Sequence, residues 1–287
     1  MATTNHEPFA VAETFRIGGD LPVHRMGFGA MRITGPGIWG APQNPLEAKL
    51  LLRRGLSLGI DLIDTADSYG PEVSEELIAA ALHPYPAGLL IATKGGFLRP
   101  APGRWQPDCR PAHLKAACEN SLRRLRLERI DLYQLHTVDD RVPFEDSVGA
   151  LSELRSSGKI CHVGLSNVSL DQLRHAQSIV PIASVQNRYN LFERQSEEVL
   201  IACQDAGIAF IPWRPIGAGS LPANRTLAKT AKAHNATPSQ IALAWLLRHS
   251  PVMMPIPGTS SITHLEENMA ALTINLSQPE IDSLDSL

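Results

Sequence analysis

Short apolar segments alternate with helical patterns along almost the whole sequence, and this alternation limits the possible folds more than any other feature. Eight segments have the length and apolar content of buried strands: residues 26–30, 60–64, 89–94, 130–136, 160–165, 183–186, 208–213 and 252–256. Helical patterns follow them, over about 45–57, 72–82, 111–126, 144–157, from 169, over 194–206, up to 249 and up to 271. Strands that alternate with helices indicate a parallel sheet, and eight such units suit closure into a (β/α)8 barrel. We therefore expect an α/β fold, a TIM barrel, formed by residues 1–287 as a single domain.

Local signals refine this expectation. Apolar residues on both sides of Gly18-Gly19-Asp20 predict a short N-terminal β-hairpin over residues 13–25. Residues 169–172 and 237–240 have the sequence of helix capping boxes. An open, doubly wound parallel sheet is the competing arrangement, but no Gly-x-Gly-x-x-Gly follows the first strand.

Composition excludes several classes of protein. Lys and Arg total 26 against 29 Asp and Glu, and without a basic run this argues against a nucleic-acid partner. The four cysteines have no metal-site spacing, so we expect reduced thiols and no metal. The first residues lack the pattern of a signal peptide, and no apolar run approaches the ~20 residues of a membrane helix. We expect a cytoplasmic chain with no membrane partner.

Polar residues with proton-transfer chemistry stand at the ends of three predicted strands. Asp64 ends the second strand, Lys94 the third and His136 the fourth, and Tyr69 follows Asp64 in a polar turn. In a barrel, the carboxyl ends of the strands form the active-site face. Each residue alone has a simpler reading, as a turn acid, a loop tyrosine or a core histidine. Lys94 is harder to explain in this way, because a lysine after a buried strand is rarely left unpaired.

The four residues lie in motifs that resemble those of the aldo-keto reductases. The matching segments, in the family's order, are Asp64-Thr-Ala-Asp-Ser-Tyr69-Gly70, Lys94 after the third strand, His136 after the fourth, Gly164-Leu165-Ser166-Asn167, Gln186, and Ile256-Pro257-Gly258 with Glu267-Asn268. The resemblance covers the chain from about residue 14. It implies reduction of a carbonyl by hydride transfer from a nicotinamide. Tyr69 would be the general acid, Lys94 would lower its pKa, Asp64 would hold Lys94, and His136 would orient the carbonyl oxygen.

The same resemblance implies a set of cofactor-binding residues. Ser166, Asn167 and Gln186 would hold the carboxamide, and Trp213 would stack on the nicotinamide. The whole set is Ser166, Asn167, Gln186, Trp213, Arg214, Pro215, Gly217, Gly219, Ser220, Leu221, Gly258, Thr259, Ser260, His264, Glu267 and Asn268. The start of a helix after Ser261 suits the 2′-phosphate of NADPH, which we expect in preference to NADH.

Two positions depart from the family's pattern. Gly258 and His264 stand where many members have a lysine or arginine, and Arg214 stands where serine is common. Arg214 would reach the cofactor phosphates or face solvent. The absence of a lysine or arginine at positions 258 and 264 weakens the preference for NADPH.

Aromatic residues in the early loops predict the substrate pocket. Trp39, Phe97 and Trp105 would form an apolar or aromatic wall. Residues 33–40 resemble the first loop of the pyridoxal-reductase-like bacterial branch of the family. We therefore expect a small-molecule carbonyl substrate, an aromatic or small aldehyde, with pyridoxal among the candidates.

Other functions remain open at this point. A barrel metallohydrolase lacks its ligands at Gly29-Ala30-Met31, and a glycosidase lacks its second carboxylate at Trp213-Arg214. A Schiff-base lyase that uses Lys94, and a nicotinamide-binding regulatory subunit without turnover, are the alternatives. The family is often monomeric, and we expect a monomer.

Overall fold

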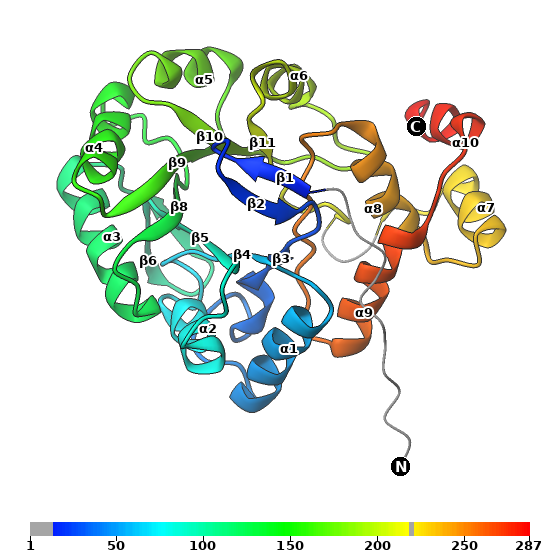
Figure 1. Ribbon diagram of the computed structural model, residues 1–287, viewed down its shortest axis with the longest axis horizontal. Coiled ribbons are helices and arrows are strands. Elements are labelled where there is room, and N and C mark those ends of the chain that lie inside the picture. Colours follow the sequence, from blue (N-terminus) through cyan, green and yellow to red (C-terminus); the bar gives the residue numbers. More distant parts are fainter. Residues whose placement is uncertain (1–13, 218–220) are drawn as a thin grey trace.

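The computed structural model describes residues 14–217 and 221–287, and its centre is a curled parallel sheet. The hydrogen-bonded strands follow the order β11-β10-β9-β8-β5-β4-β3. Their bounds are β3 (Phe28–Gly29), β4 (Leu62–Asp64), β5 (Leu90–Gly95), β8 (Ile130–Leu135), β9 (Ile160–Ser166), β10 (Ile182–Gln186) and β11 (Ala209–Phe210). Helices surround the curled sheet (Figure 1), so the strands are covered on their outer side. The expected (β/α)8 architecture is confirmed.

The predicted eighth strand forms no regular strand, but it closes the barrel. The backbone N–H of Phe210 donates to Val252 O at 2.9 Å, and Met254 N–H donates to Phe210 O at 2.8 Å. On the other side, Gly27 N–H donates to Pro255 O at 3.0 Å. Prolines in and beside this segment have no N–H, so a continuous ladder of hydrogen bonds cannot form. The prediction was right about the position of the segment and wrong about its regularity. The seventh strand is likewise shorter than expected.

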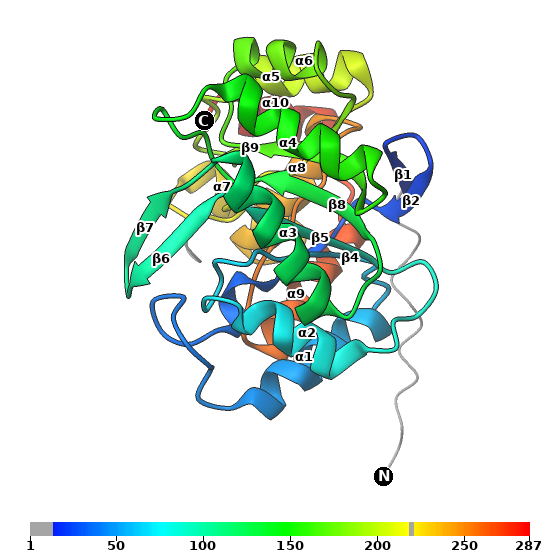
Figure 2. The same cartoon turned by 90° about the vertical axis from the view of Figure 1, so that its left-hand side faces the viewer.

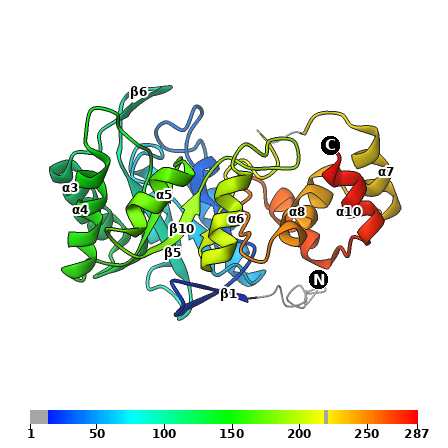
Figure 3. The same cartoon turned by 90° about the horizontal axis from the view of Figure 1, so that it is seen from above.

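The helices lie close to the predicted positions. They are α1 (Pro45–Ser57), α2 (Val73–Leu82), α3 (Pro111–Leu125), α4 (Phe144–Ser156), α5 (Leu170–Gln177), α6 (Glu197–Ala206), α7 (Arg225–Ala233), α8 (Pro238–His249), α9 (Ile262–Ala270) and α10 (Gln278–Asp285), with 3-10 turns η1 (Ala30–Ile33) and η2 (Ala271–Thr273). Both predicted capping boxes, which begin at Ser169 and Thr237, are present. Figure 3 shows α7 and α10 beside each other, away from the hairpin and the α3–α4 side.

The N-terminal hairpin closes one end of the barrel. Strands β1 (Thr14–Ile17) and β2 (Leu21–His24) pair antiparallel and lie across the centre of the barrel in Figure 1. The side chains of Ile17 and Val23 are buried in one cluster with Leu62 and Met254 of the barrel interior. A two-stranded hairpin is not stable alone in water, so this apolar contact holds it in place.

A second hairpin projects from the opposite end, where a loop was expected. Strands β6 (Phe97–Ala101) and β7 (Arg104–Pro107) pair antiparallel, and Figure 2 shows them at the far side of the barrel from β1 and β2. The turn is made by Pro102 and Gly103, and Gly103 has a left-handed φ of 71°. Pro-Gly is a strong turn signal, but the short, partly exposed strands beside it do not show the alternation of a regular hairpin.

Candidate active site

A buried ion pair joins the ends of two neighbouring strands. Asp64 ends β4, and Lys94 lies near the end of β5, which pairs with β4 in parallel. Lys94 Nζ lies 2.6 Å from Asp64 Oδ1 and also donates to the backbone oxygen of Thr65 at 2.8 Å. The ion pair compensates the cost of burying each charge, since an isolated buried ion is strongly unfavourable.

The second carboxylate oxygen of Asp64 accepts two more hydrogen bonds. Gln134 Nε2 donates to Oδ2 at 3.1 Å and Gln186 Nε2 at 2.8 Å. Gln186 therefore lies beside Asp64 at the end of β10 and contacts its carboxylate. Gln134 was missed in the sequence, although a glutamine inside a buried strand is a usable signal. These amides fix the orientation of Asp64.

Tyr69 lies beside the ammonium group. Its Oη is 3.5 Å from Lys94 Nζ, and its side chain is buried. Burial raises the pKa of the Tyr69 phenol, and the nearby Lys94 only partly offsets this rise. Lys94 lowers the pKa of Tyr69 as expected, but burial outweighs it, so the expected net fall of this pKa towards neutrality is wrong. The phenol is protonated at neutral pH, which is the form that a general acid requires.

His136 follows β8 directly and completes the group of four. Its ring centroid lies 5.7 Å from that of Tyr69, and its Nδ1 lies 3.3 Å from Ser68 Oγ. Burial, and then the charge of Lys94, hold the pKa of His136 well below its usual value. The imidazole is therefore neutral at pH 7 and can donate one hydrogen bond without carrying charge.

The predicted pocket aromatics surround this group. The Phe97 ring lies 4.8 Å from that of His136, and the Trp105 ring lies 6.4 Å from that of Tyr69. Trp39 is held close by, since it forms an isolated bridge with Gly70. All three predicted pocket residues therefore lie near Asp64, Tyr69, Lys94 and His136. A cation that was not predicted lies among them: Arg99 Cζ is 3.8 Å from the Trp105 ring centroid and 5.6 Å from that of Trp39.

Three predicted carboxamide and stacking residues are linked to His136 by hydrogen bonds. Asn167 Nδ2 donates to His136 O at 3.0 Å and to Ser166 Oγ at 3.1 Å. Trp213 Nε1 donates to Asn167 Oδ1 at 2.9 Å. The half-buried Trp213 ring is thus tied to the end of β9 and is not a core tryptophan.

The loop after Trp213 is described only in part. Arg214 is exposed, has a left-handed φ of 54°, and its Cζ lies 5.7 Å from the Trp213 ring. Pro215 is buried, while Gly217 and Leu221 are half-buried. Two other predicted cofactor residues, Gly219 and Ser220, fall outside the described residues.

The segment before α9 explains one departure from the family's pattern. A Cβ at Gly258 would lie 2.6 Å from Gly29 O, which leaves no room for any side chain. A cation cannot therefore be placed at 258 in this chain. Thr259 is buried and its Oγ1 accepts from Ser261 N–H at 3.0 Å, whereas Ser260 and His264 are exposed.

Two features of this region concern the predicted cofactor residues. A cavity of about 720 Å³ is lined by residues 31–38, by residues in the loop before α1 and the start of α1, and by Ser260. Asn268 is buried, and its Nδ2 has no hydrogen-bond partner among the described residues. Purine nitrogens could satisfy that donor. Its neighbour Glu267 is half-buried, and its backbone oxygen accepts from Gln240 Nε2 at 2.9 Å.

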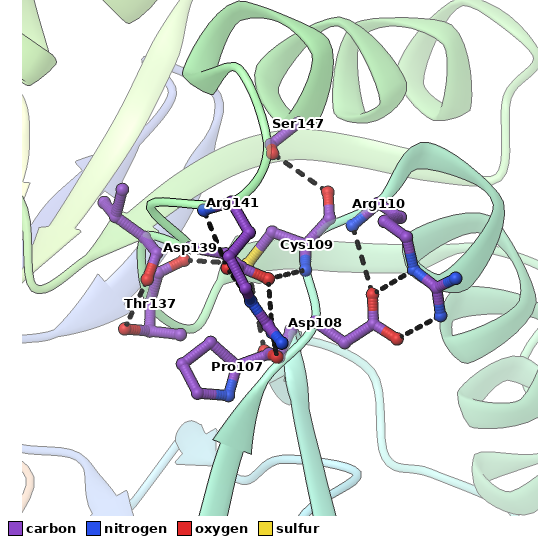
Figure 4. A network of polar contacts seen from close by, with 10 residues as sticks. Pro107, Asp108, Cys109, Arg110, Thr137, Asp139, Arg141 and Ser147 are labelled. Atoms are coloured by element: carbon purple, nitrogen blue, oxygen red, sulfur yellow. Dashed lines mark hydrogen bonds and ion pairs between the residues drawn. The ribbon is translucent and has the colours of Figure 1, made fainter.

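A polar network anchors the β6–β7 hairpin to the loop after β8 (Figure 4). Asp139 accepts from Cys109 N–H at 3.3 Å and from Arg141 Nε at 2.8 Å, and Arg141 also donates to Pro107 O. Ser147 Oγ donates to Cys109 O at 2.9 Å. Burial raises the pKa of the Cys109 thiol to about 12, so this cysteine is an unreactive structural residue. The network fixes the base of the hairpin that carries Phe97, Arg99 and Trp105.

Among residues 14–217 and 221–287, no group of three or more His, Cys, Asp or Glu side chains is placed to hold a metal ion. In the same part of the chain, no helix has the length and apolar character needed to cross a membrane.

The chain belongs to the aldo/keto reductase family, whose model matches residues 25–287. It is an NAD(P)H-dependent oxidoreductase.

An uncharacterised oxidoreductase of Schizosaccharomyces pombe is 48% identical over 268 residues, which cover 93% of this chain and 87% of that protein. Pyridoxine 4-dehydrogenase of Escherichia coli K12 is 40% identical over 282 residues, covering 96% and 98%. The crystal structure of an aldo/keto reductase from Klebsiella pneumoniae in complex with NADP and acetate has a TM-score of 0.82 and 30% identity, and the match covers 96% of this chain and 95% of that one.

Proposed function

We propose that this protein reduces the carbonyl group of small or aromatic aldehydes, pyridoxal among them, with NADPH as the hydride donor. The observation that carries the proposal is the buried Asp64–Lys94 pair beside a protonated Tyr69 and a neutral His136. Bound NADPH would supply the hydride. The residues of the chain would supply the proton and the polarising hydrogen bond.

Tyr69 is proposed as the proton donor. The alcohol oxygen of the product needs a proton, and the phenol holds one throughout the neutral pH range because its pKa is raised. Loss of this proton leaves a phenolate 3.5 Å from the Lys94 ammonium, which stabilises the new negative charge. His136, neutral and buried, would donate a hydrogen bond to the carbonyl oxygen and orient it.

Ser166, Asn167, Gln186 and Trp213 would hold the nicotinamide, since they lie at adjacent strand ends near His136. The loop that contains Arg214, Pro215, Gly217, Gly219, Ser220 and Leu221 would cover the pyrophosphate. Thr259, Ser260 and His264, at the start of α9, would bind the 2′-phosphate, because helix amino termini favour anions. Asn268, with Glu267, would bind the adenine. The NADP complex of the Klebsiella pneumoniae relative supports this choice of cofactor.

The substrate class follows from the aromatic wall and from one relative. Phe97 and Trp105 place apolar rings around His136, as an aromatic aldehyde requires. The match to pyridoxine 4-dehydrogenase makes pyridoxal, the aldehyde related to pyridoxine, the first compound to test.

The test compares the wild type with Tyr69→Phe on pyridoxal and a panel of aldehydes, with NADPH and with NADH. We expect kcat/KM to fall about 10²- to 10⁴-fold in Tyr69→Phe, while NADPH affinity stays within a few-fold. Tyr85→Phe is the matched control, since Tyr85 lies in the loop before β5 and its Oη donates to Leu125 O at the end of α3. A wild type that binds NADPH but reduces no aldehyde would show a binding protein without turnover. Trapping of substrate on Lys94 by borohydride would instead indicate a Schiff-base lyase.

A further inference from the structure

Arg99 is a buried cation beside the predicted pocket aromatics, and no carboxylate pairs with it in the part of the chain that the structure describes. Only 8% of its surface is exposed, and its Nη1 donates to Ser68 O at 2.8 Å. Its Nε and Nη2 are buried and have no hydrogen-bond partner among residues 14–217 and 221–287. Burying such donors without partners is unfavourable, and an apolar side chain would avoid that cost. The guanidinium therefore requires an explanation beyond packing.

The two unused groups form the edge of the guanidinium that binds carboxylates elsewhere in this protein. Arg110 holds Asp108 with Nε at 2.8 Å and Nη2 at 2.6 Å, and Arg141 holds Asp139 with the same two nitrogens (Figure 4). Two parallel N–H groups on one edge match the two oxygens of a carboxylate or phosphate. In Arg99 the Nε–Nη2 edge makes no hydrogen bond to the described residues, and Nη1 is held by its hydrogen bond to Ser68 O.

The position of Arg99 places this edge at the catalytic group. Its anchor, Ser68, precedes Tyr69, and the Ser68 hydroxyl lies 3.3 Å from His136 Nδ1. The guanidinium stacks on Trp105, whose ring lies 6.2 Å from that of His136. Trp39 and Trp105 are only half-buried, so the rings that cover the guanidinium are themselves in contact with solvent. The polar network at the base of the hairpin fixes the backbone that carries Arg99.

We propose that the physiological substrate is an aldehyde that carries an anionic group, a carboxylate or a phosphate, and that the Nε–Nη2 edge of Arg99 binds this group. The inference rests on the proposed function and narrows its substrate class. Arg99 is then a specificity-determining residue that holds the end of the substrate away from the carbonyl. A neutral aldehyde gains nothing from this contact.

The experiment measures kcat/KM for pairs of aldehydes that differ by the anion: benzaldehyde against its 2-, 3- and 4-carboxy derivatives, and pyridoxal against pyridoxal 5′-phosphate. We expect the wild type to prefer the anionic member of at least one pair by about tenfold or more. The pair that responds distinguishes a carboxylate from a phosphate. Arg99→Met should lose this preference, because its kcat/KM should fall about tenfold or more further for the anionic member of the pair than for the neutral one. Arg99→Lys should keep part of it, and Arg104→Met, on the exposed side of the same hairpin, should keep all of it.

Two results would overturn the inference while leaving the proposed function intact: no anionic preference in the wild type, or an equal loss for both members of each pair in Arg99→Met. An equal loss for both members would mean that Arg99 acts only by holding the Ser68 backbone through its hydrogen bond to Ser68 O. If the wild type reduces no aldehyde, the proposed function fails. The role of Arg99 in binding an anion is then tested by a binding measurement. Quenching of tryptophan fluorescence by 4-carboxybenzyl alcohol, but not by benzyl alcohol, would then support it if the quenching is lost in Arg99→Met and partly kept in Arg99→Lys. Equal responses to both alcohols would refute it.

Discussion

Lys94 Nζ lies 2.6 Å from Asp64 Oδ1, and the two side chains are 0% and 2% exposed. The charge of each is tolerated in the barrel interior only because the other is present. Gln134 and Gln186 donate to the remaining carboxylate oxygen, so the position of the pair is determined from four different strands. The proton donor Tyr69 is placed against this fixed pair.

Removing the acid of this pair is expected to destabilise the protein strongly. Asp64→Asn leaves the Lys94 ammonium buried and unpaired, which costs about 3–5 kcal/mol of unfolding free energy. Chemical denaturation measures this loss. The double variant Asp64→Asn/Lys94→Met should be less destabilised than Asp64→Asn alone, because no buried charge remains. A double variant that loses the sum of both single effects would show that the two residues are not coupled.

The Ser68 hydroxyl is expected to position His136. A hydroxyl that donates to Nδ1 keeps the ring hydrogen on Nε2, where it can be donated to a carbonyl oxygen. Ser68→Ala should lower kcat about fivefold and change the KM for NADPH little, since the loss of one hydrogen bond corresponds to about 1 kcal/mol. Ser68→Thr keeps the hydroxyl and should retain more activity. Equal activity of the wild type and Ser68→Ala in steady-state assays would show that the Ser68 hydroxyl does not position His136.

The stability of the protein is expected to fall with pH below 6.5, in part through His136. Its folded-state pKa lies well below the unfolded value of 6.5, so the unfolded chain takes up the proton first as the pH falls. The contribution of the neutral ring is complete above pH 6.5 and is lost on acidification, by up to about 1.4 kcal/mol per pH unit. Denaturation at pH 7.5 and 5.5 should show a smaller decline for His136→Gln than for the wild type. Identical declines would contradict the assigned pKa direction.

The N-terminal hairpin is expected to stabilise the barrel through one apolar side chain above all. Ile17 is fully buried against the barrel interior, and Ile17→Ala should lower the unfolding free energy by about 2–5 kcal/mol. Leu46→Ala is the control, because Leu46 is 62% exposed and should change stability by less than about 0.5 kcal/mol. A barrel that is insensitive to Ile17→Ala would mean that the hairpin is dispensable for closure.

Much of the fold could be predicted from local patterns. The periods of apolar residues and the capping boxes at Ser169 and Thr237 predicted most helices within a few residues. The β6–β7 hairpin was missed because its strands are short and partly exposed, which weakens the alternation that marks a strand. The eighth segment was predicted as regular, but its prolines prevent a continuous ladder, and only a few hydrogen bonds join it to its neighbours.

The sequence by itself determined which chemical groups stand at the strand ends, because an acid, a lysine or a histidine after an apolar run has a fixed place in a parallel barrel. Only the tertiary structure decided what these groups do to one another. The raised pKa of Tyr69, the glutamines on Asp64, the glycine contact at Gly258 and the unused edge of Arg99 all arise between residues far apart in the chain. Burial and the distances between groups determine such effects, and neither can be derived from the spacing of residues along a sequence.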